Sequence, residues 1–482
     1  MARSALELRG IAKRYGDAWA LAGVDFDARS GEIHALCGEN GAGKSTLANI
    51  AAGALAPTSG TIFRCGRAGL VHQHFELIGR LRVWENVALG YEPRRGVRLD
   101  HDAARERVRD LGRRYGLAAD PDAVVETLPV ALAQRVEILR ELSREPAILI
   151  LDEPTAVLAP PEIEALFATL RALARGGTAI VVVTHKLAEV AAYADWVTVL
   201  RGGRIVASDA LGETSPDAIA HAMVGGALPE VAARADRVPG PLFETRAVAT
   251  ADGTLGPISF AVGAGEIVAI AGVEGNGQTQ LVDAVAGTLA VTGAMLLGGV
   301  ALAPGDPARR IARGIRTIPQ DRQREALVLP WTVAENIALG DHARAPLRRG
   351  LFVDIRARAA LAEKVVTEFD VRGPGPRAPV AALSGGNQQK LVVGRALAHE
   401  PRLVLAYQPT RGIDIGAAAL VRSRLIEARN AGVGILLVSF DLDEILALAD
   451  VVLVLYRGAF AGRFPRAAFE RDRIGAAMTG AV

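Results

Sequence analysis

The residues best suited to chemistry by type and spacing form a glycine-rich segment at positions 38–45, which reads GENGAGKS. The segment matches the pattern G-x-x-x-x-G-K-[ST], with a buried strand expected before it at 32–37 and a helix after it at 46–54. In such a loop the backbone N–H groups point at phosphate oxygens, and the start of the helix adds positive potential. Lys44 is expected to reach the outer phosphates and the Ser45 hydroxyl to ligate Mg²⁺. We therefore predict a polyphosphate site.

Two acids stand at the end of an apolar stretch at 147–151, which is expected to be a buried strand. The carboxyl ends of strands in an α/β sheet border the crevice where ligands bind. Asp152 is therefore expected to hold the Mg²⁺ shell, and Glu153 to polarise the attacking water. Paired acids also cap surface strands without any catalytic role, but a strand that is apolar throughout favours the catalytic interpretation.

The elements that must position these residues occur twice, because the two halves of the chain repeat each other. SGEI at 30–33 followed by GENG at 38–41 returns as AGEI at 264–267 followed by GVEGNG at 272–277. ENVALG at 85–90 returns as ENIALG at 335–340, and Pro154-Thr155 returns as Pro409-Thr410. A unit this long indicates duplicated domains and not a solenoid. We expect domains at 1–228 and 242–482, joined by a proline-containing linker at 229–241.

Composition excludes several classes of protein. The chain has 482 residues, 50% of them hydrophobic, and no apolar run approaches the roughly 18–20 residues that a membrane span needs. The N-terminus is too polar for a secretory signal, so we expect a soluble, cytoplasmic chain. A net charge of +2 argues against nucleic acid as the main partner. The two cysteines, Cys37 and Cys65, exclude a disulfide framework, and Cys37 is expected to be a small buried residue.

These motifs together resemble the ATP-binding cassette (ABC) family over nearly the whole chain. Positions 383–390 read LSGGNQQK, which is similar to the family's signature sequence at the start of a helix. The resemblance implies an ATPase of the α/β class with ATP and Mg²⁺ as ligands. It also implies two P-loop nucleotide-binding domains, each with a mixed, largely parallel sheet, an antiparallel β subdomain and a helical subdomain. In this family two cassettes meet head to tail, and each ATP lies between the phosphate loop of one and the signature of the other.

The resemblance also assigns roles to single residues. Gln73, in VHQHF at 71–75, is similar to the glutamine that links Mg²⁺ and water to the membrane partner. Tyr15 resembles the aromatic residue that stacks on adenine, although a core residue would look the same, and His185 resembles a γ-phosphate sensor. The expected catalytic residues are Lys44, Gln73, Glu153 and His185, and the expected metal ligands are Ser45, Gln73 and Asp152. The expected ATP-binding residues are Tyr15, Gly38, Glu39, Asn40, Gly41, Ala42, Gly43, Lys44, Ser45, Thr46, Ser384, Gly385, Gly386 and Asp414.

The halves depart from the family pattern at different places. In the second half Gln278 stands in place of the loop lysine, Tyr407 and Gln408 in place of the two acids, and Phe440 in place of the histidine. The positions that make up this degenerate second site are Gly272, Gly277, Gln278, Thr279, Gln320, Tyr407, Gln408 and Phe440. The first half keeps its acids but has LPVALAQR at 128–135, where Pro129 offers neither a hydroxyl nor an N–H. It also has Ala159 where the second copy has Asp414.

Head-to-tail pairing sorts these losses into one complete site and one incomplete site. The complete site takes its phosphate loop and acids from the first half and its signature from the second. A dead paralogue would instead carry lesions in both sites. Because the glycines of the second loop survive, that site retains the backbone for nucleotide binding without cleavage, and the sequence leaves open whether it binds.

The sequence favours the energy-coupling subunit of a membrane importer. Soluble tandem cassettes that act on ribosomes or nucleic acid typically carry a long charged linker or a coiled-coil insertion, and neither occurs here. A complete first site disfavours a purely regulatory module. The expected partners are two integral-membrane permease subunits and an extracytoplasmic substrate-binding protein, with this chain peripheral on the cytoplasmic face of the inner membrane. Segments 71–75 and 134–138 look most like the nucleoside importers, and a pentose or hexose is the alternative substrate.

Overall fold

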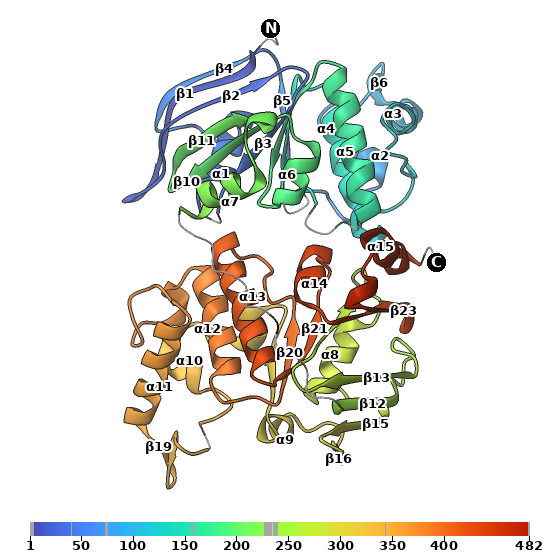
Figure 1. Ribbon diagram of the computed structural model, residues 1–482. Helices are drawn as coiled ribbons and strands as arrows, with labels where there is room; N and C mark the ends of the chain where they lie inside the picture. The colour runs from blue at the N-terminus through green and yellow to red at the C-terminus, as the bar shows by residue number, and fades with distance from the viewer. Residues whose placement is uncertain are drawn as a thin grey trace. The chain divides into compact units, whose positions relative to one another are not determined.

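The computed structural model describes residues 4–39, 41–72, 76–155, 158, 160–225, 234, 240–342 and 344–480. The chain divides into two compact units, Met1–Leu228 (unit 1) and Pro229–Val482 (unit 2). Each unit contains a six-stranded sheet, a smaller antiparallel sheet and a set of helices (Figure 1). The expected α/β class with two domains of this composition is confirmed.

The six-stranded sheet of unit 1 has the order β11-β10-β3-β9-β8-β5, and all neighbours are parallel except β10 and β11. Every residue of its central strands is buried, and most are apolar, as parallel strands covered by helices require. The strands are β3 (Ile33–Cys37), β5 (Ala68–Val71), β8 (Ile148–Asp152), β9 (Ala179–Val183), β10 (Trp196–Arg201) and β11 (Arg204–Ala210). The antiparallel sheet has the order β2-β1-β4, from β1 (Ser4–Tyr15), β2 (Ala18–Arg29) and β4 (Ser59–Arg64).

Unit 2 repeats this topology strand for strand, with the order β23-β22-β14-β21-β20-β17 in its six-stranded sheet. The strands are β14 (Ile267–Ala271), β17 (Ile315–Ile318), β20 (Leu403–Tyr407), β21 (Gly434–Val438), β22 (Val451–Tyr456) and β23 (Ala459–Pro465). The antiparallel sheet is formed by β12 (Pro241–Ala249), β13 (Ile258–Gly263), β15 (Thr292–Leu297) and β16 (Val300–Ala301). The two units therefore present equivalent strand ends, and their sites can be compared position by position.

Several helices begin at a residue whose side chain caps the first turn. The Asp100 side chain accepts a hydrogen bond from the Ala103 amide at the start of α3, and Thr332 and Glu335 form a capping box at α10. The helices of unit 1 are α1 (Lys44–Ala52), α2 (Val83–Ala88), α3 (His101–Tyr115), α4 (Val130–Leu142), α5 (Pro160–Arg175), α6 (Leu187–Tyr193) and α7 (Pro216–Val224). Those of unit 2 are α8 (Gln278–Ala286), α9 (Pro307–Ala312), α10 (Val333–Ala338), α11 (Ile355–Glu368), α12 (Gly385–Leu397), α13 (Ile415–Asn430), α14 (Leu442–Leu448) and α15 (Arg471–Thr479). Short 3₁₀ turns span Val125–Thr127, Leu211–Glu213, Val380–Ala382 and Arg466–Ala468, and a π-type turn spans Arg322–Ala326.

Each unit has two hydrophobic cores, one on each face of its six-stranded sheet. In unit 1 one core packs α1 and the antiparallel sheet, and the other packs helices α2 to α5. In Figure 1 the antiparallel sheet and the α2–α3 pair accordingly lie on opposite sides of the unit. Cys37 is fully buried at the end of β3, as expected, and burial raises the pKa of its thiol to about 12.

His34 in β3 gives unit 1 a pH-dependent stability. Its side chain is 4% exposed and its Nε2 lies 2.8 Å from the Thr198 hydroxyl. Burial lowers the pKa of His34 to about 3, so the unfolded chain takes up a proton below about pH 6.5 that the folded chain refuses. Stability is therefore full above pH 6.5 and falls as the pH drops toward 3.

We expect the unfolding free energy of unit 1 to fall by about 2 kcal/mol more in the wild type than in His34→Val when the pH goes from 7.5 to 5. Valine is the matched replacement, because Val268 occupies the equivalent position of β14 in unit 2. Urea titrations of both proteins at the two pH values measure the difference. If the unfolding free energies of the two proteins changed equally with pH, the imidazole of His34 would not be both buried and neutral.

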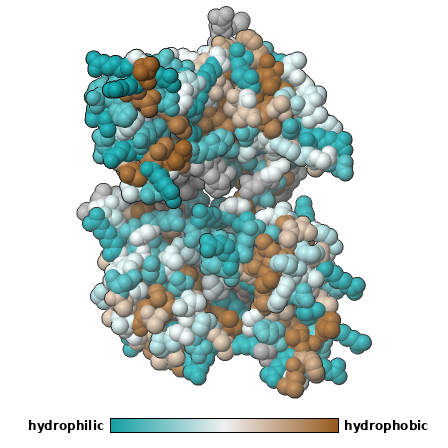
Figure 2. All heavy atoms as spheres, turned by 180° about the vertical axis from the view of Figure 1, so that it is seen from behind, coloured by the Kyte–Doolittle hydropathy of each residue, from teal (hydrophilic) through white to brown (hydrophobic). Residues whose placement is uncertain are grey.

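Exposed apolar side chains gather at one hairpin in each unit. In unit 2 the hairpin of β18 (Arg348–Arg349) and β19 (Phe352–Val353) carries Leu351, which is 89% exposed, and its tip is brown at the lower right of Figure 2. In unit 1 the hairpin of β6 (Arg94–Arg95) and β7 (Arg98–Leu99) carries Val97, which is 98% exposed. Such patches mark contact surfaces. Among the described helices, none combines the length and apolar composition that crossing a bilayer requires.

Candidate functional site

The phosphate loop of unit 1 connects β3 to α1. Gly38 and Gly43 have φ angles of 154° and 103°, which L side chains rarely adopt. A Cβ at Gly43 would lie 2.5 Å from the Ala20 carbonyl oxygen, and one at Gly38 would collide with the Leu200 carbonyl. The helix begins at Lys44, two residues earlier than expected, directly after the left-handed Gly43. No side chain caps its first amides, which are thus free to face a phosphate.

Lys44 lies inside this loop and is 6% exposed. Its Nζ donates to the carbonyl oxygens of Gly38 at 2.8 Å and Glu39 at 3.0 Å. Burial lowers the pKa of Lys44, while the nearby charges of Glu153 and Asp152 act in the opposite direction. The ammonium group is therefore held in the cradle of the loop, next to the two acids that the sequence singled out.

Asp152 is the last residue of β8 and is 8% exposed. Burial raises its pKa, and a hydrogen bond with Ser45 lowers it in part. A serine hydroxyl beside a carboxylate fits Mg²⁺, which prefers oxygen ligands and usually keeps several waters and the phosphates of its substrate. Among the described residues there is no group of three His, Cys, Asp or Glu side chains that could hold a metal alone.

Glu153 follows at once and meets His185. The Nδ1 of His185 lies 3.0 Å from the Oε1 of Glu153. Burial pushes the pKa of Glu153 upward, but the contact with His185 and the charge of Lys44 outweigh it, so the pKa is lowered. Glu153 adopts a φ of 49°, an uncommon conformation for glutamate that turns its side chain away from the direction of the strand.

The topology explains why these residues meet. β9 lies between β3 and β8 and is parallel to both. The loop after β3, the acids after β8 and His185 after β9 therefore emerge at one edge of the sheet. Three segments that are far apart in the sequence are brought together by neighbouring strands.

The other expected residues of unit 1 have different outcomes. Tyr15 ends β1 and is 51% exposed, with the ammonium of Lys13 5.5 Å from its ring centre. The alternative that Tyr15 is a core residue is therefore wrong. Asn40, Gln73 and Ala159 lie outside the described residues.

The signature residues of unit 2 surround the start of α12. Ser384 precedes the helix, and its hydroxyl accepts from Asn387 Nδ2 at 2.8 Å. A Cβ on Gly386 would lie 2.9 Å from Asp414 Oδ2, so the loop after β20 lies against the signature. In unit 1 Pro129 precedes α4 with nearly the same backbone as Ser384, φ −54° against −63°. The backbone turn survives in unit 1, but the hydroxyl is lost.

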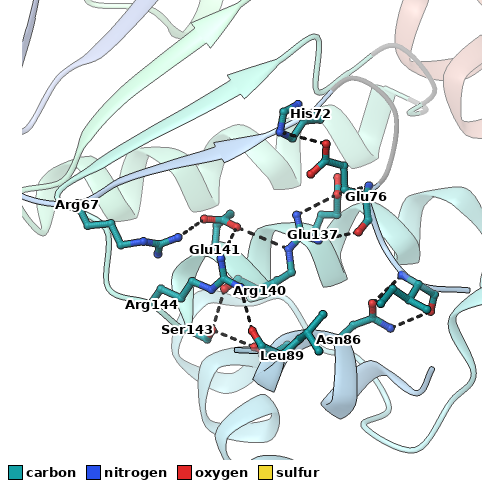
Figure 3. A network of polar contacts seen from close by, with 12 residues as sticks. Arg67, His72, Glu76, Asn86, Leu89, Glu137, Arg140, Glu141, Ser143 and Arg144 are labelled. Carbon is teal, nitrogen blue, oxygen red and sulfur yellow. Dashed lines mark hydrogen bonds and ion pairs between the residues drawn. The ribbon is translucent and has the colours of Figure 1, made fainter. Parts of the chain in front are cut away.

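A further group of residues was missed by the sequence reasoning (Figure 3). Arg140 of α4 donates to the Glu76 carbonyl at 2.9 Å, and Glu137 accepts from the Glu76 amide at 2.7 Å. Unit 2 repeats the first contact, because Arg395 of α12 donates to the Ala326 carbonyl at 2.8 Å. Both arginines occupy the same place in the internal repeat, which is the signal that would have found them. They tie the helix after the signature to the chain just beyond Gln73 and Gln320.

The residues of the degenerate second site occupy the corresponding places in unit 2. Gln278 starts α8, and Tyr407 ends β20 with its hydroxyl 3.1 Å from that of Thr279. Gln408 has a φ of 47°, matching Glu153, and Phe440 packs edge-on against Tyr407. Gly272, Gly277 and Gln320 keep their places in the loop and after β17. Burial raises the pKa of Tyr407, so its phenol is neutral at ordinary pH.

Comparisons with known proteins agree with this geometry. The family model described as "ABC transporter" matches residues 21–156 and again 255–411. The nucleoside import ATP-binding protein NupA of Lactococcus lactis subsp. cremoris is 38% identical, covering 98% of both chains. The guanosine import ATP-binding protein NupO of Bacillus subtilis is 37% identical over 94% of this chain and 93% of its own. A ribose import ATP-binding protein, RbsA 1 of Rubrobacter xylanophilus, is 38% identical over 98% and 97%.

Among solved structures, the complex of archaeal ribosomal stalk protein aP1 and archaeal ribosome recycling factor aABCE1 matches with a TM-score of 0.64. The match covers 92% of this chain and 87% of the other, at 18% identity, and it shows the fold alone. The relatives match this chain over nearly their whole lengths, and the family model matches both halves. The chain belongs to the ABC transporter family, as an ATPase with one ATP-binding domain in each half.

Proposed function

We propose that this chain is the ATP-hydrolysing subunit of a nucleoside importer, with a single hydrolytic site assembled from both halves. The observation that carries the proposal is the distribution of the machinery. Lys44, Glu153 and His185 lie together in unit 1, whereas unit 2 has uncharged side chains at these positions and the intact signature. Each half thus supplies what the other lacks.

In this site Glu153 acts on the attacking water. Its lowered pKa keeps it ionised, so that it can accept a hydrogen bond from water and orient it toward the γ-phosphate. Lys44 and the amides of α1 bind the phosphate oxygens, on which negative charge is spread in the transition state. Mg²⁺ held by Ser45, Gln73 and Asp152 would neutralise part of the same charge. The signature of unit 2, with Ser384, Gly385, Gly386 and Asp414, closes the site from the other side.

Two permease subunits and an extracytoplasmic binding protein are the partners that this function needs. A groove of about 550 Å³ in unit 2 supports the permease contact. It is lined by α8, by α9 and by the segments on either side of α10, and Arg310, Asp341 and Arg395 border it. In the described part of unit 2, Nε and Nη1 of the buried Arg310 have no hydrogen-bond partner. The groove is thus the place we propose for a short helix from a permease, whose polar side chains would meet both arginines and the acidic Asp283 and Glu325.

The contacts of Arg140 and Arg395 suggest how such a helix would be sensed. Each arginine donates to the carbonyl of a residue that follows a glutamine by a few positions, Glu76 in unit 1 and Ala326 in unit 2. A movement of the segment after the glutamine would be passed through the arginine to the helix that begins at the signature.

In this function the chain is a peripheral protein on the cytoplasmic face of the inner membrane.

A nucleoside is proposed as substrate because the nucleoside and guanosine importers match over nearly their whole lengths. A sugar is the second candidate, favoured by the ribose importer at equal identity. A soluble ATPase acting on ribosomes is a third class, for which the archaeal recycling factor offers likeness of fold alone.

Uptake measurements in cells separate these candidates. In a strain that lacks this chain, the wild type is expected to restore uptake of radiolabelled guanosine, and Glu153→Gln is expected to give only background uptake because hydrolysis is blocked. Labelled ribose in the same strains is the matched control and should not depend on this chain. Dependence of ribose uptake alone would establish the sugar. If uptake of neither guanosine nor ribose depends on the chain, and uptake of a labelled hexose does not depend on it either, the importer proposal is wrong, and sedimentation with ribosomes becomes the informative measurement.

A further inference from the structure

The phosphate loop of unit 2 keeps the backbone of the one in unit 1. Gly272 and Gly277 have φ angles of 152° and 105°, against 154° and 103° for Gly38 and Gly43. In both units the helix begins directly after the second of these glycines, and no side chain caps its first amides. The backbone geometry of a phosphate loop is therefore present twice, although in unit 2 the Asn276 amide donates to Gln278 and not toward a ligand.

Gln278 braces this loop without a charge. It is 1% exposed, its Oε1 accepts from the Asn276 amide at 3.1 Å, and its Nε2 donates to the Val273 carbonyl at 3.1 Å. Lys44 makes equivalent bonds to loop carbonyls in unit 1. The loop of unit 2 is consequently preformed although its lysine is missing.

Tyr407 occupies the place of the metal-binding carboxylate. Its hydroxyl is hydrogen-bonded to Thr279, the counterpart of Ser45, and its ring is 4% exposed and packed edge-on against Phe440. A neutral phenol is a poor ligand for Mg²⁺ compared with a carboxylate. The threonine hydroxyl is left as the single candidate protein ligand among the two positions that hold the metal in unit 1. The residues present in unit 2 therefore do not fit Mg²⁺.

The charged side chains around the two phosphate loops also differ, and the difference bears on the need for a metal ion. In unit 1 the buried Asp152 and Glu153 lie close to the phosphate loop and would repel a polyphosphate, so a bridging cation is needed there. In unit 2 the equivalent positions hold Tyr407 and Gln408, so the repulsion from two buried carboxylates is absent there, while the exposed Glu274 on the loop itself is the nearby charge that acts on Tyr407. A polyphosphate entering unit 2 meets backbone N–H groups and uncharged side chains at these positions.

We propose that the phosphate loop of unit 2 binds a nucleoside di- or triphosphate without a divalent metal ion. The inference rests on the proposed function, since it describes the non-hydrolytic site of the same ATPase. The bound nucleotide is not cleaved, because the groups needed for hydrolysis are missing. Gln278 replaces the cationic lysine, Tyr407 the metal-binding carboxylate, and Gln408 the carboxylate that acts on water.

Counting both ligands on the full chain tests this. The probes are a labelled, non-hydrolysable ATP analogue and Mn²⁺. The label counts the bound nucleotide, and the electron paramagnetic resonance signal counts the bound metal. We expect about two nucleotides but only about one Mn²⁺ per chain at saturation. Tyr407→Asp is expected to raise the metal count to about two without changing the nucleotide count. Tyr407→Phe, which keeps the ring, should stay at about one.

Two matched glycine variants assign the ligands to the units. A side chain at Gly277 or Gly43 would meet the carbonyl of Thr254 or Ala20 and close the respective loop. Gly277→Val is expected to remove one nucleotide and no Mn²⁺, whereas Gly43→Val should remove one nucleotide together with the Mn²⁺. Circular dichroism and thermal melting establish that each variant is folded.

The alternative counts have separate meanings. Equal numbers of nucleotide and metal at both sites would overturn the metal-free site. One nucleotide with one metal, both lost in Gly43→Val, would show that unit 2 binds no nucleotide and would also overturn the inference. Absence of any bound nucleotide in the wild type would overturn the proposed function itself.

Discussion

Glu153→Gln is expected to lower the kcat of ATP hydrolysis by about 10²–10⁴-fold while leaving ATP binding nearly unchanged. Glutamine has the size of glutamate and can keep a hydrogen bond to His185, which now lies 3.0 Å from the carboxylate. It cannot accept a proton or orient water with a full negative charge. Loss of rate without loss of binding is therefore the expected pattern.

The measurement is steady-state phosphate release together with nucleotide binding on the same preparations. Gln408→Ala is the matched control, since Gln408 has the same left-handed backbone as Glu153, φ 47° against 49°, at the end of the equivalent strand. Gln278→Ala is a second control at the lysine position. Both are expected to keep the rate within about threefold, because the loop of unit 2 carries no catalytic group. Equal losses in all three variants would rule out a single hydrolytic site.

Much of unit 1's site could be predicted from sequence because its chemistry is local. The spacing of Gly38, Gly43 and Lys44 specifies a loop between a strand and a helix, and a fully apolar strand ending in Asp152 specifies the sheet edge. The strands expected at 32–37 and 147–151 were found at Ile33–Cys37 and Ile148–Asp152, each within one residue of the expected bounds. Runs of buried residues bounded by glycine or polar residues leave little freedom in register.

What could not be predicted depends on contacts between distant segments. Nothing near Tyr407 in the sequence indicates that its hydroxyl meets Thr279, because the two lie on neighbouring elements more than a hundred residues apart. The approach of Asp414 to Gly386 is equally a product of packing. The start of α1 at Lys44 differed from the expected position because the left-handed Gly43 ends the loop there, a backbone property that composition does not reveal.

The composite nature of the hydrolytic site makes a second strong prediction. Ser384→Ala is expected to lower the rate of ATP hydrolysis by about 10-fold or more, although Ser384 belongs to the half that lacks the acids and the lysine. Its hydroxyl, now held by Asn387, would donate to a γ-phosphate oxygen bound by unit 1. Pro129→Ala is the matched control in unit 1, where the backbone turn is the same but no hydroxyl exists to lose. It should leave the rate unchanged.

Mixing two inactive proteins tests whether the contributing halves belong to one chain. In Glu153→Gln the signature is intact, and in Ser384→Ala the acids are intact. If unit 1 pairs with unit 2 of its own chain, an equimolar mixture has no complete site, and its rate should stay at the mean of the two variants. If units of different chains pair, the mixture regains up to about a quarter of the wild-type rate, since one site in four would combine two intact halves.

A loss in Pro129→Ala as large as in Ser384→Ala would contradict the composite site altogether, because it would mean that both signatures serve hydrolysis.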